Sequence, residues 1–239
     1  MSGLGAAGRS KEPLPQGDDK ARRVRAMFDS ISPRYDLVNR VMTFGMDVGW
    51  RRRAIDELRL PARALVLDLA CGTGDLCEEL SGEGYRPVGV DFSLGMLRRA
   101  RQRSPVLLVQ ADVLRLPVRD AAADGVTCGF ALRNVVSLEG FFEEVGRVVR
   151  PGGRISLLDV SRPDRALLRA GHTVYFERVV PVIGGLLSDR EAYGYLPRSM
   201  GYLPDPERMM TMLRRAGFGD TQRSQLSGGI VQLLTGTRT

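Results

Sequence analysis

Short apolar runs alternate with amphipathic segments along most of the chain. The run at residues 64–70 is apolar at nearly every position, which predicts a strand buried on both faces. The next segment begins with acidic residues and continues with helical spacing, which predicts a helix. Similar runs recur at residues 87–90, 106–110, 125–130 and 154–160. Strands that alternate with helices in this way predict an α/β fold with a parallel sheet.

The C-terminal part departs from this alternation. Residues 205–217 begin with an Asp-Pro pair and end with glycine, which predicts a helix with both of its boundaries. Residues 221–226 and 230–237 are strand-like runs around a Gly-Gly pair, so we expect an antiparallel hairpin. The sheet is therefore expected to hold seven strands, mostly parallel, with the hairpin at its end.

Two further regions have a different composition. Residues 1–19 are rich in Gly, Ser, Pro and charge and are expected to form a disordered tail. Residues 20–58 are expected to form a helical cap, and residues 59–239 the main domain. We expect the cap to contain three helices, from residue 18 or 19 to Ile31, at residues 34–50 and at residues 51–58.

An apolar segment interrupts the main domain. Residues 166–187 are strongly apolar and lie within an insertion at about 162–203, longer than an ordinary crossover. We interpret the insertion as a helical lid over a binding crevice, and an apolar lid implies an apolar substrate. Extra core packing or a dimer interface is the alternative. His172 within the lid fits a packed helix residue better than a base, although both roles are open.

A glycine-rich turn follows the first buried strand. Asp68, Gly72 and Gly74 fit the pattern Asp-x-x-x-Gly-x-Gly, which resembles motif I of the class I methyltransferases. Cys77 stands where a dinucleotide fingerprint has its third glycine, and the lysine of a phosphate loop is absent. The carboxylates of Asp68 and Asp75 flank the turn and favour a cation over a phosphate. S-adenosylmethionine, a cation without phosphate, fits this charge, whereas a purely structural turn is the alternative.

Acidic residues also follow the next two predicted strands. Asp91 ends the second strand, seventeen residues after Gly74, and Asp112 follows the third. The carboxyl ends of parallel strands meet at one edge, so we expect these acids and Asp68 to converge on one crevice. Asp91 is placed to accept hydrogen bonds from the hydroxyls of an adenosine ribose, and Asp112 from the adenine amino group. A helix cap at Asp91 and a turn residue at Asp112 are the alternatives.

Composition narrows the classes of function. The formal net charge is +7, which is compatible with an anionic membrane surface or with nucleic acid. Nucleic-acid binding is not expected, because basic residues form no stripe with interleaved aromatics. Three cysteines and one histidine, without ligand spacing, predict no metal site and a reducing, cytoplasmic location. No signal peptide and no apolar run long enough to span a membrane are found.

Four segments carry a more specific resemblance. They are residues 35–50, 66–75, 130–135 and 147–161, and the pattern Tyr-x-Tyr-Leu-Pro-x-Ser at residues 193–199 agrees with them. From about Arg22 to its end, the chain resembles the ubiquinone/menaquinone biosynthesis C-methyltransferase family. The resemblance implies a class I methyltransferase (Rossmann-like) fold. It also implies transfer of a methyl group from S-adenosyl-L-methionine to a ring carbon of a polyprenyl quinol, with demethylmenaquinol as the favoured substrate.

The same resemblance implies roles for individual residues. Cofactor contacts fall at Thr73, Asp91, Asp112, Val113 and Gly129, while Arg133, Asn134 and Tyr35 are implied to face the ring. The chain departs from the family at three positions, with Thr43 for serine, Asp47 for histidine and Asp159 for glutamate. If that histidine acts in acid–base chemistry, Asp47 or another group must replace it.

A quinol hydroxyl has a phenol-like pKa of about 10. Its deprotonation moves electron density onto the adjacent ring carbon, which attacks the methyl group in line while S-adenosylhomocysteine leaves. We expect Arg133 to stabilise the phenolate and Tyr35 to orient the hydroxyl. The site must also align the reacting atoms and exclude water.

The polyprenyl tail of such a substrate also indicates where in the cell the protein acts. A polyprenyl tail lies in the bilayer, so we expect a peripheral protein on the inner face of the membrane, with its lid and arginines at the surface. A homodimer is compatible with the sequence. The alternatives to a quinol methyltransferase are a C- or O-methyltransferase for another apolar phenolic compound, an NAD-dependent oxidoreductase and a non-catalytic cofactor-binding protein.

Overall fold

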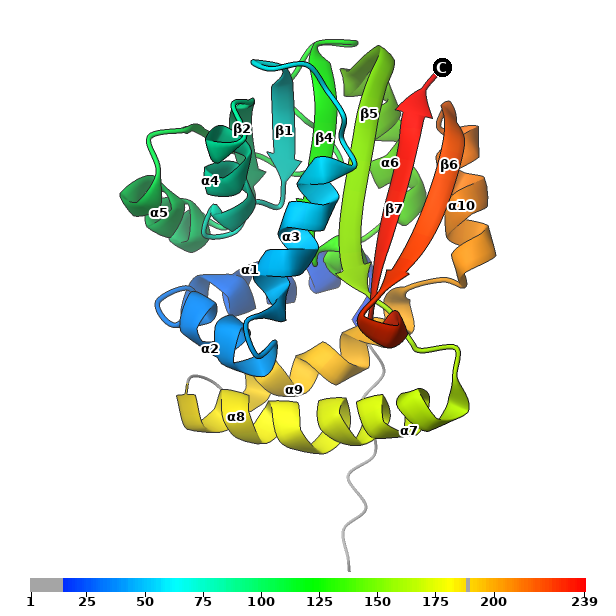
Figure 1. The fold of residues 1–239 in the computed structure, drawn as a ribbon. Helices are drawn as coiled ribbons and strands as arrows, with labels where there is room; N and C mark the ends of the chain where they lie inside the picture. The colour runs from blue at the N-terminus through cyan, green and yellow to red at the C-terminus, as the bar shows by residue number, and fades with distance from the viewer. Residues whose placement is uncertain (1–14, 188–189) are drawn as a thin grey trace, which may run out of the picture.

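The computed structural model describes residues 15–187 and 190–239. Its centre is a seven-stranded sheet in the order β3-β2-β1-β4-β5-β7-β6 (Figure 1). The first five strands pair in parallel, and β7 lies antiparallel between β5 and β6. The strands are β1 (Leu65–Leu69), β2 (Arg86–Asp91), β3 (Leu107–Gln110), β4 (Ala123–Gly129), β5 (Val149–Val160), β6 (Phe218–Leu226) and β7 (Val231–Arg238). The predicted seven-stranded fold with its antiparallel end is confirmed.

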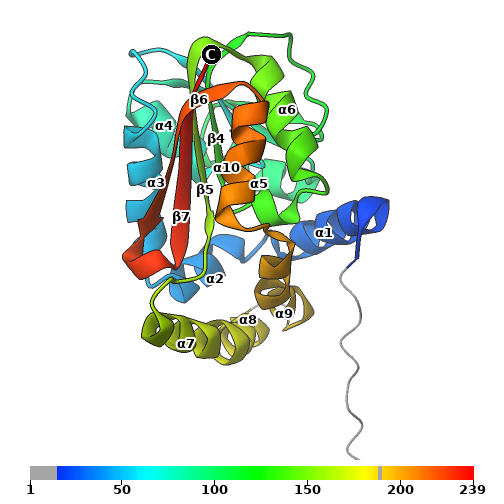
Figure 2. The same cartoon turned by 90° about the vertical axis from the view of Figure 1, so that its right-hand side faces the viewer.

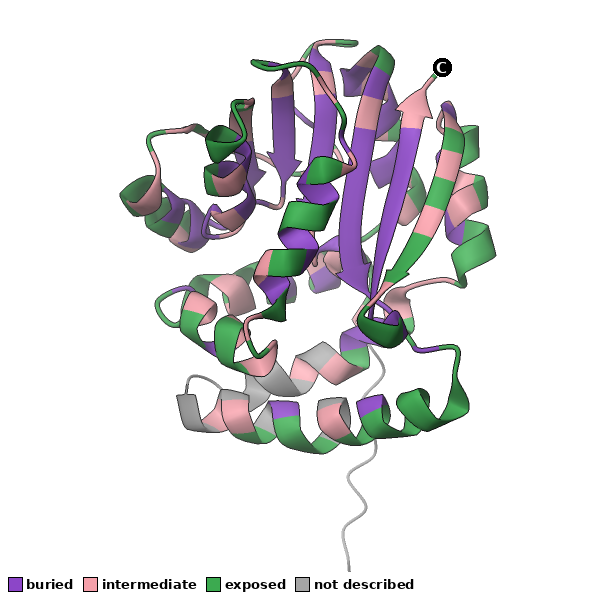
Figure 3. Ribbon diagram, viewed as in Figure 1, coloured by how far each residue is buried: buried purple, intermediate pink, exposed green. Residues whose placement is uncertain are grey.

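Helices cover both faces of the sheet. α3 (Met46–Asp56) and α4 (Asp75–Gly82) lie on one face, and α6 (Leu138–Val148) and α10 (Pro206–Arg215) on the other (Figure 2). α5 (Leu94–Arg103) packs beside β2 and β3. The core between these layers includes Phe141 and Phe142 of α6, whose rings are fully buried against each other. The central strands are buried along most of their length, as apolar runs without alternation predict (Figure 3).

The remaining helices gather at the carboxyl ends of the parallel strands. They are α1 (Gly17–Ile31), α2 (Tyr35–Met42), α7 (Ala166–Val174), α8 (Val180–Leu187), α9 (Arg190–Ser199) and the short η1 (Leu132–Asn134), η3 (Met200–Tyr202) and η4 (Ser227–Gly229). A π-helical stretch, η2 (Tyr175–Val179), joins α7 to α8, so residues 166–187 are helical throughout, as predicted. This long helix runs below the sheet in Figure 1. No helix among the described residues has the length and apolar character that crossing a bilayer requires.

The N-terminal helices differ from the prediction. α1 begins at Gly17, before the expected tail boundary, and residues 1–14 of the tail lie outside the described residues. The single helix expected at residues 34–50 is two helices, because Phe44 and Gly45 adopt left-handed backbone angles (φ 51° and 74°) between α2 and α3. The predicted break near Arg51 is absent, since α3 continues to Asp56. Asp47 and Arg51 therefore lie one turn apart on the same helix.

Candidate active site

A first cavity lies at the carboxyl ends of β1, β2 and β4, and we call it the strand-end cavity. Gly72 follows β1, Asp91 ends β2 and Gly129 ends β4, so one edge of the sheet supplies three of its walls. Helix α1 covers it with Val24 and Phe28. Its further lining includes Asp112 and Val113, which were expected to contact the cofactor, and Asn134 and Tyr35, which the resemblance implied to face the ring.

Asp91 is held rigidly in this cavity. Its side chain is 4% exposed, and its two oxygens accept hydrogen bonds from the backbone N–H groups of Gly72 and Ser93, each at 2.8 Å. Ser93, whose Oγ accepts from Met96 N–H at 3.1 Å, caps α5, so the helix-cap alternative for Asp91 is wrong. Burial raises the pKa of Asp91 to about 6, despite the hydrogen bonds that favour its charged form. Asp91 is therefore mostly a carboxylate at neutral pH.

The backbone and amide groups around Asp91 leave room for a ligand. Gly72 has φ +55°, and a Cβ there would meet no atom within 4 Å, so a ligand can approach its backbone closely. The N–H of Gly72 is directed to Asp91 instead of toward a phosphate. Asn134 carries a buried side-chain oxygen that accepts no hydrogen bond from the residues described. Such an acceptor suits an ammonium or hydroxyl donor of the ligand.

The charge of the strand-end cavity selects among cofactors. Asp91 and Asp112 supply carboxylates, and the described lining contains no lysine or arginine. This charge favours a cationic ligand and opposes a pyrophosphate. The residues present therefore fit S-adenosylmethionine, which requires acceptors for its ribose and ammonium groups and no phosphate site.

Three predicted contacts build the glycine loop without lining the cavity. Asp68 is fully buried and accepts hydrogen bonds from Thr127 Oγ1 at 2.9 Å and Cys77 Sγ at 3.4 Å. Burial raises its pKa to about 7. The Thr73 hydroxyl donates to Asp36 on α2, which ties the loop to the cap. Gly74 has φ +86°, and a Cβ there would approach Cβ of Ala100 at 3.1 Å.

Asp75, beside the glycine loop, does not present a free negative charge to a ligand. The sequence shows no basic residue within the turn, but Arg51 Nη1 lies 3.3 Å from the Asp75 carboxylate, and Arg103 also pairs with it. Both arginines come from helices distant in sequence from the turn. Asp75 is therefore neutralised, and Asp91 and Asp112 carry the negative charge that a ligand meets.

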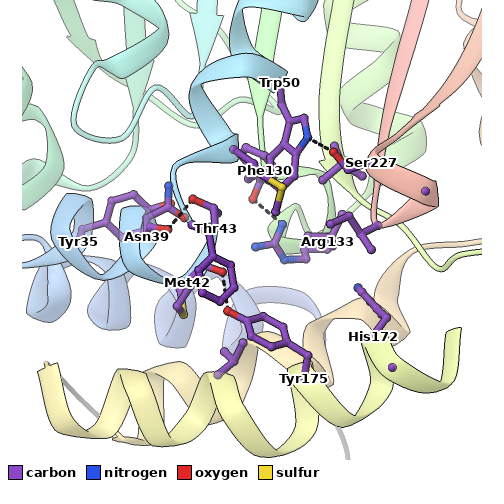
Figure 4. Close-up of a pocket in the computed structure, with 18 of the residues that line it drawn as sticks. Tyr35, Asn39, Met42, Thr43, Trp50, Phe130, Arg133, His172, Tyr175 and Ser227 are labelled. Atoms are coloured by element: carbon purple, nitrogen blue, oxygen red, sulfur yellow. Dashed lines mark hydrogen bonds between the residues drawn. The ribbon is translucent and has the colours of Figure 1, made fainter. Parts of the chain in front are cut away.

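A second cavity, which we call the lid cavity, lies between the lid and the sheet (Figure 4). It has a volume of about 420 Å³ and is lined mainly by apolar side chains. Lid residues Leu168 and His172 face it from one side, and Trp50 of α3 from the other. Phe28, Tyr35 and Phe130 line both cavities. The two cavities therefore adjoin at these three side chains.

Consecutive residues of η1 serve different cavities. Arg133 lines the lid cavity, whereas Asn134 lines the strand-end cavity. Arg133 is 7% exposed, and its guanidinium forms an ion pair with Asp159 and donates to the carbonyl of Phe130 at 2.7 Å. A fixed cation is thus placed at the junction, where it can stabilise an anion that develops in the lid cavity.

Tyr35 lies at the same junction. Its ring packs edge-on against Phe28, with centroids 6.1 Å apart. Burial raises the pKa of Tyr35, and the nearby Arg133 opposes this only in part. Tyr35 is therefore a neutral hydroxyl at physiological pH, able to orient a bound hydroxyl group by hydrogen bonding.

Asp47 does not occupy the position that a catalytic base needs. It lines neither cavity and is 1% exposed. Its carboxylate pairs with Arg51 Nη1 at 2.8 Å and accepts from Thr43 Oγ1 at 2.7 Å. Burial alone would raise its pKa, but the hydrogen bond from Thr43 and the charge of Arg51 lower it. Asp47, one candidate to replace the family's histidine, therefore lies outside both cavities and is paired with Arg51 one helical turn later on α3.

Two residues that hold the site together were not expected from the sequence. Tyr175 of the lid donates to the carbonyl of Met42 at 2.6 Å, and its ring lies 5.9 Å from that of Phe44, which joins the lid to the cap. Lys20 is buried, donates to Val135 at 2.6 Å and ties α1 across the strand-end cavity. The positions of Tyr175 and Lys20 depend on contacts between segments that are distant in sequence, so the local sequence pattern does not predict their roles.

The fold matches known methyltransferases. A SAM-dependent methyltransferase from Thermotoga maritima superposes with a TM-score of 0.65 and 20% identity, over 90% of this chain and 99% of that one. Phosphoethanolamine N-methyltransferase 2 of Haemonchus contortus, solved with S-adenosyl-L-methionine, gives a TM-score of 0.60 and 12% identity, over 80% of this chain and 52% of that one. At these identities the likeness concerns the fold alone.

Other relatives share a larger fraction of their sequence with this chain than these two structures do. Demethylmenaquinone methyltransferases of Roseiflexus castenholzii and Deinococcus radiodurans are each 40% identical, over 94% and 96% of this chain and 97% and 98% of theirs. The ubiquinone/menaquinone biosynthesis C-methyltransferase UbiE of Syntrophotalea carbinolica is 39% identical over 90% of this chain and 93% of its own. The model of the ubiE/COQ5 methyltransferase family matches residues 16–238. The chain thus belongs to the ubiE/COQ5 methyltransferase family and is an enzyme that uses S-adenosylmethionine as its methyl donor.

Proposed function

We propose that the enzyme methylates a ring carbon of a polyprenylated quinol, converting demethylmenaquinol to menaquinol. The observation that carries this proposal is the junction of the two cavities at Phe28, Tyr35 and Phe130. A methyl donor in the acidic strand-end cavity then lies next to a substrate in the apolar lid cavity. The names of the similar enzymes from Roseiflexus and Deinococcus support this choice of substrate.

In the strand-end cavity, Asp91 is the acceptor for the ribose hydroxyls and Asp112 lies toward the adenine. Asp91 can take this role because its oxygens are already oriented by Gly72 and Ser93. Asn134 offers its buried oxygen to a donor of the amino-acid part. When bound there, S-adenosylmethionine supplies an electrophilic methyl group on a sulfonium.

In the lid cavity, the quinol ring lies between Arg133 and Tyr35. Tyr35 orients the ring hydroxyl, and the Arg133 guanidinium stabilises the phenolate that forms when the hydroxyl loses its proton. The negative charge makes the adjacent ring carbon nucleophilic. Phe130, Trp50 and the apolar lid exclude water from the reacting atoms and contact the first part of the prenyl tail.

We propose further that the lid face contacts the cytoplasmic surface of the membrane. Exposed apolar side chains gather on the cap and lid, among them Phe44 at 73% and Leu167 at 86% exposure. Exposed arginines accompany them at positions 34, 40, 162, 165, 169 and 178. Apolar side chains inserted among anionic headgroups, with arginines at the phosphates, suit a protein that collects its substrate from the bilayer. A second copy of the chain on this face is the competing occupant.

Quinone analysis in a deletion strain tests the substrate. Loss of the gene should cause a demethylated quinone to accumulate, and its ring identifies the substrate as a naphthoquinol or a benzoquinol. The purified enzyme, given S-adenosylmethionine labelled with ¹³C in its methyl group and demethylmenaquinol, should place the label on a ring carbon. An unchanged quinone pool together with no labelled product would refute the proposal.

A further inference from the structure

Asp36 joins two parts of the proposed active site that come from distant segments of the chain. It follows Tyr35 in the first turn of α2, and Tyr35 lines both cavities. The carboxylate of Asp36 accepts a hydrogen bond from the Thr73 hydroxyl and pairs with Arg103, the last residue of α5. One helical turn therefore carries both the tyrosine at the cavity junction and the acceptor for the glycine loop.

An acid in the first turn of a helix can act solely on the helix dipole. The carboxylate of Asp36 is directed elsewhere, because one oxygen accepts from Thr73 and the other pairs with Arg103. Its side chain is 39% exposed, and an ion pair at such an exposure adds little to the stability of a fold. The contacts of Asp36 therefore act on the placement of the loop and of α2 more than on folding.

The glycine loop needs contacts that hold it in one shape. Thr73 stands between Gly72 and Gly74, which both adopt left-handed backbone angles (φ +55° and +86°). Glycines give a loop many accessible conformations. The N–H of Gly72 is held by Asp91, and the hydroxyl of Thr73, a residue 3% exposed, is held by Asp36. Gly72 lines the strand-end cavity, so a ligand there contacts the loop that Asp36 helps to fix.

Arg103 supplies the charge partner of Asp36. Its guanidinium also pairs with Asp75 at the start of α4. Asp75 has a second cation, since Arg51 Nη1 lies 3.3 Å from its carboxylate. Among the ion pairs of the described residues, Asp36 has Arg103 alone. Loss of Arg103 should therefore release Asp36 more than Asp75, while the hydrogen bond from Thr73 remains.

Asp36 also acts on its neighbour Tyr35. Burial raises the pKa of Tyr35, and the negative charge of Asp36 adds to this, although the charge of Arg133 opposes both. The hydroxyl of Tyr35 thus keeps its proton and can donate to an oxygen of the ring. Because Tyr35 and Asp36 are consecutive, a shift of the Asp36 backbone also moves Tyr35 relative to the lid cavity.

We propose that Asp36 is a positioning residue that couples occupation of the strand-end cavity to the placement of Tyr35 in the lid cavity. This inference rests on the proposed function and adds a residue that lines neither cavity. A ligand that fixes the glycine loop fixes Thr73, which through Asp36 fixes the first turn of α2. By linkage, a ring in contact with Tyr35 favours the same loop conformation, so each ligand raises the affinity for the other by the same factor.

The binding test uses S-adenosylhomocysteine and 1-naphthol, a redox-stable mimic of the quinol ring. We expect each ligand to raise the calorimetric affinity of the wild-type enzyme for the other by about 5-fold or more. Asp36→Ala should abolish this coupling, whereas Arg103→Gln leaves the hydrogen bond from Thr73 and should keep part of it. Glu139→Ala, which removes an exposed acid from the first turn of α6, should keep all of it.

A double-mutant cycle separates this link from a general loss of structure. Asp36→Ala and Thr73→Val remove the two ends of one hydrogen bond, so the double variant should couple the ligands no worse than the more impaired single variant. Should Asp36→Ala fail to fold in thermal unfolding, Asp36→Asn replaces it. Its amide oxygen still accepts from Thr73 but lacks the charge that Arg103 binds, so it should show the partial coupling of Arg103→Gln.

Three results would overturn the proposal while the enzyme still methylates the quinol. They are full coupling in folded Asp36→Ala, or in Asp36→Asn where it replaces the alanine variant; fully additive losses in the cycle; and independent binding of the two ligands to the wild type. Failure of the wild-type enzyme to methylate the quinol would refute the proposed function, and this inference with it.

Discussion

Asp159 holds Arg133 at two points. Its carboxylate, fully buried near the end of β5, forms an ion pair with the Arg133 guanidinium and accepts the backbone N–H of the same residue at 3.1 Å. The guanidinium at the cavity junction is therefore fixed by the sheet itself. A side chain that is oriented before the substrate arrives stabilises a developing phenolate at little further cost.

Asp159→Asn should lower kcat by roughly 10- to 100-fold, because the guanidinium loses the fixed direction that the Asp159 carboxylate gives it. Arg133→Ala should lower kcat by about 100- to 1,000-fold. Since both residues act on the ring side of the junction, calorimetric affinity for S-adenosylhomocysteine should stay at the wild-type value in both variants. A parallel loss of that affinity would place Arg133 in the cofactor site instead.

Asp91→Asn should weaken S-adenosylhomocysteine binding by about 10- to 100-fold, which is the loss of affinity expected when a hydrogen bond to a charged acceptor is removed. Glu83→Gln, an exposed acid, serves as the control. The pKa of Asp91 is raised to about 6, so the wild-type dissociation constant should rise as the pH falls through 6 and the carboxylate becomes protonated. An affinity that is unchanged in Asp91→Asn and flat with pH would exclude the ribose role.

Asp47→Ala should destabilise the protein by about 1–3 kcal/mol, because Arg51 and Thr43 lose a buried hydrogen-bond partner. The pKa of Asp47 is lowered in the folded state, so its contribution is present at neutral pH and disappears as the pH falls below the ordinary value of about 3.9. Asp120→Ala, which removes an exposed acid, is the control in thermal unfolding. Below the unfolding transition kcat should be retained; its abolition would restore Asp47 as a base.

Phe44→Ser combined with Leu167→Ser should reduce binding to vesicles that contain phosphatidylglycerol by at least about tenfold. Each substitution removes apolar side-chain surface that would otherwise be buried in the bilayer. Added salt should weaken binding of the wild type, since the arginines act through screened charges. Leu107→Ser, exposed at 65% on β3, should bind like the wild type. A wild-type dimer in solution that dissociates in the double variant would assign this face to a second copy.

The sheet was predictable because buried parallel strands are apolar along their whole length, and Asp91 and Asp112 could be assigned to one edge from chain order alone. The cap was less predictable. The cap is broken at Phe44 and Gly45, which adopt left-handed backbone angles. The sequence on both sides of this break still has a helical pattern, so the pattern does not indicate the break. The break expected near Arg51 is absent, and the continuous helix α3 therefore places Asp47 and Arg51 one turn apart.

Side-chain roles were predictable only where the partner is local. The sequence places Asp68 and Asp75 beside the glycine loop, but Thr127, Arg51 and Arg103, which satisfy them, come from distant elements. His172 sits in an apolar helix, where sequence alone favours a packing role. Its access to the lid cavity follows from the crossing of α7 below the sheet, which is a tertiary property.

The two adjoining cavities are central to the proposed function, and a crystal structure with S-adenosylhomocysteine tests them directly. We predict the ligand in the strand-end cavity, with its ribose hydroxyls bonded to Asp91 and its sulfur directed toward Tyr35 and the lid cavity. A ligand seated in the lid cavity, or one whose sulfur points away from Tyr35, would contradict the account.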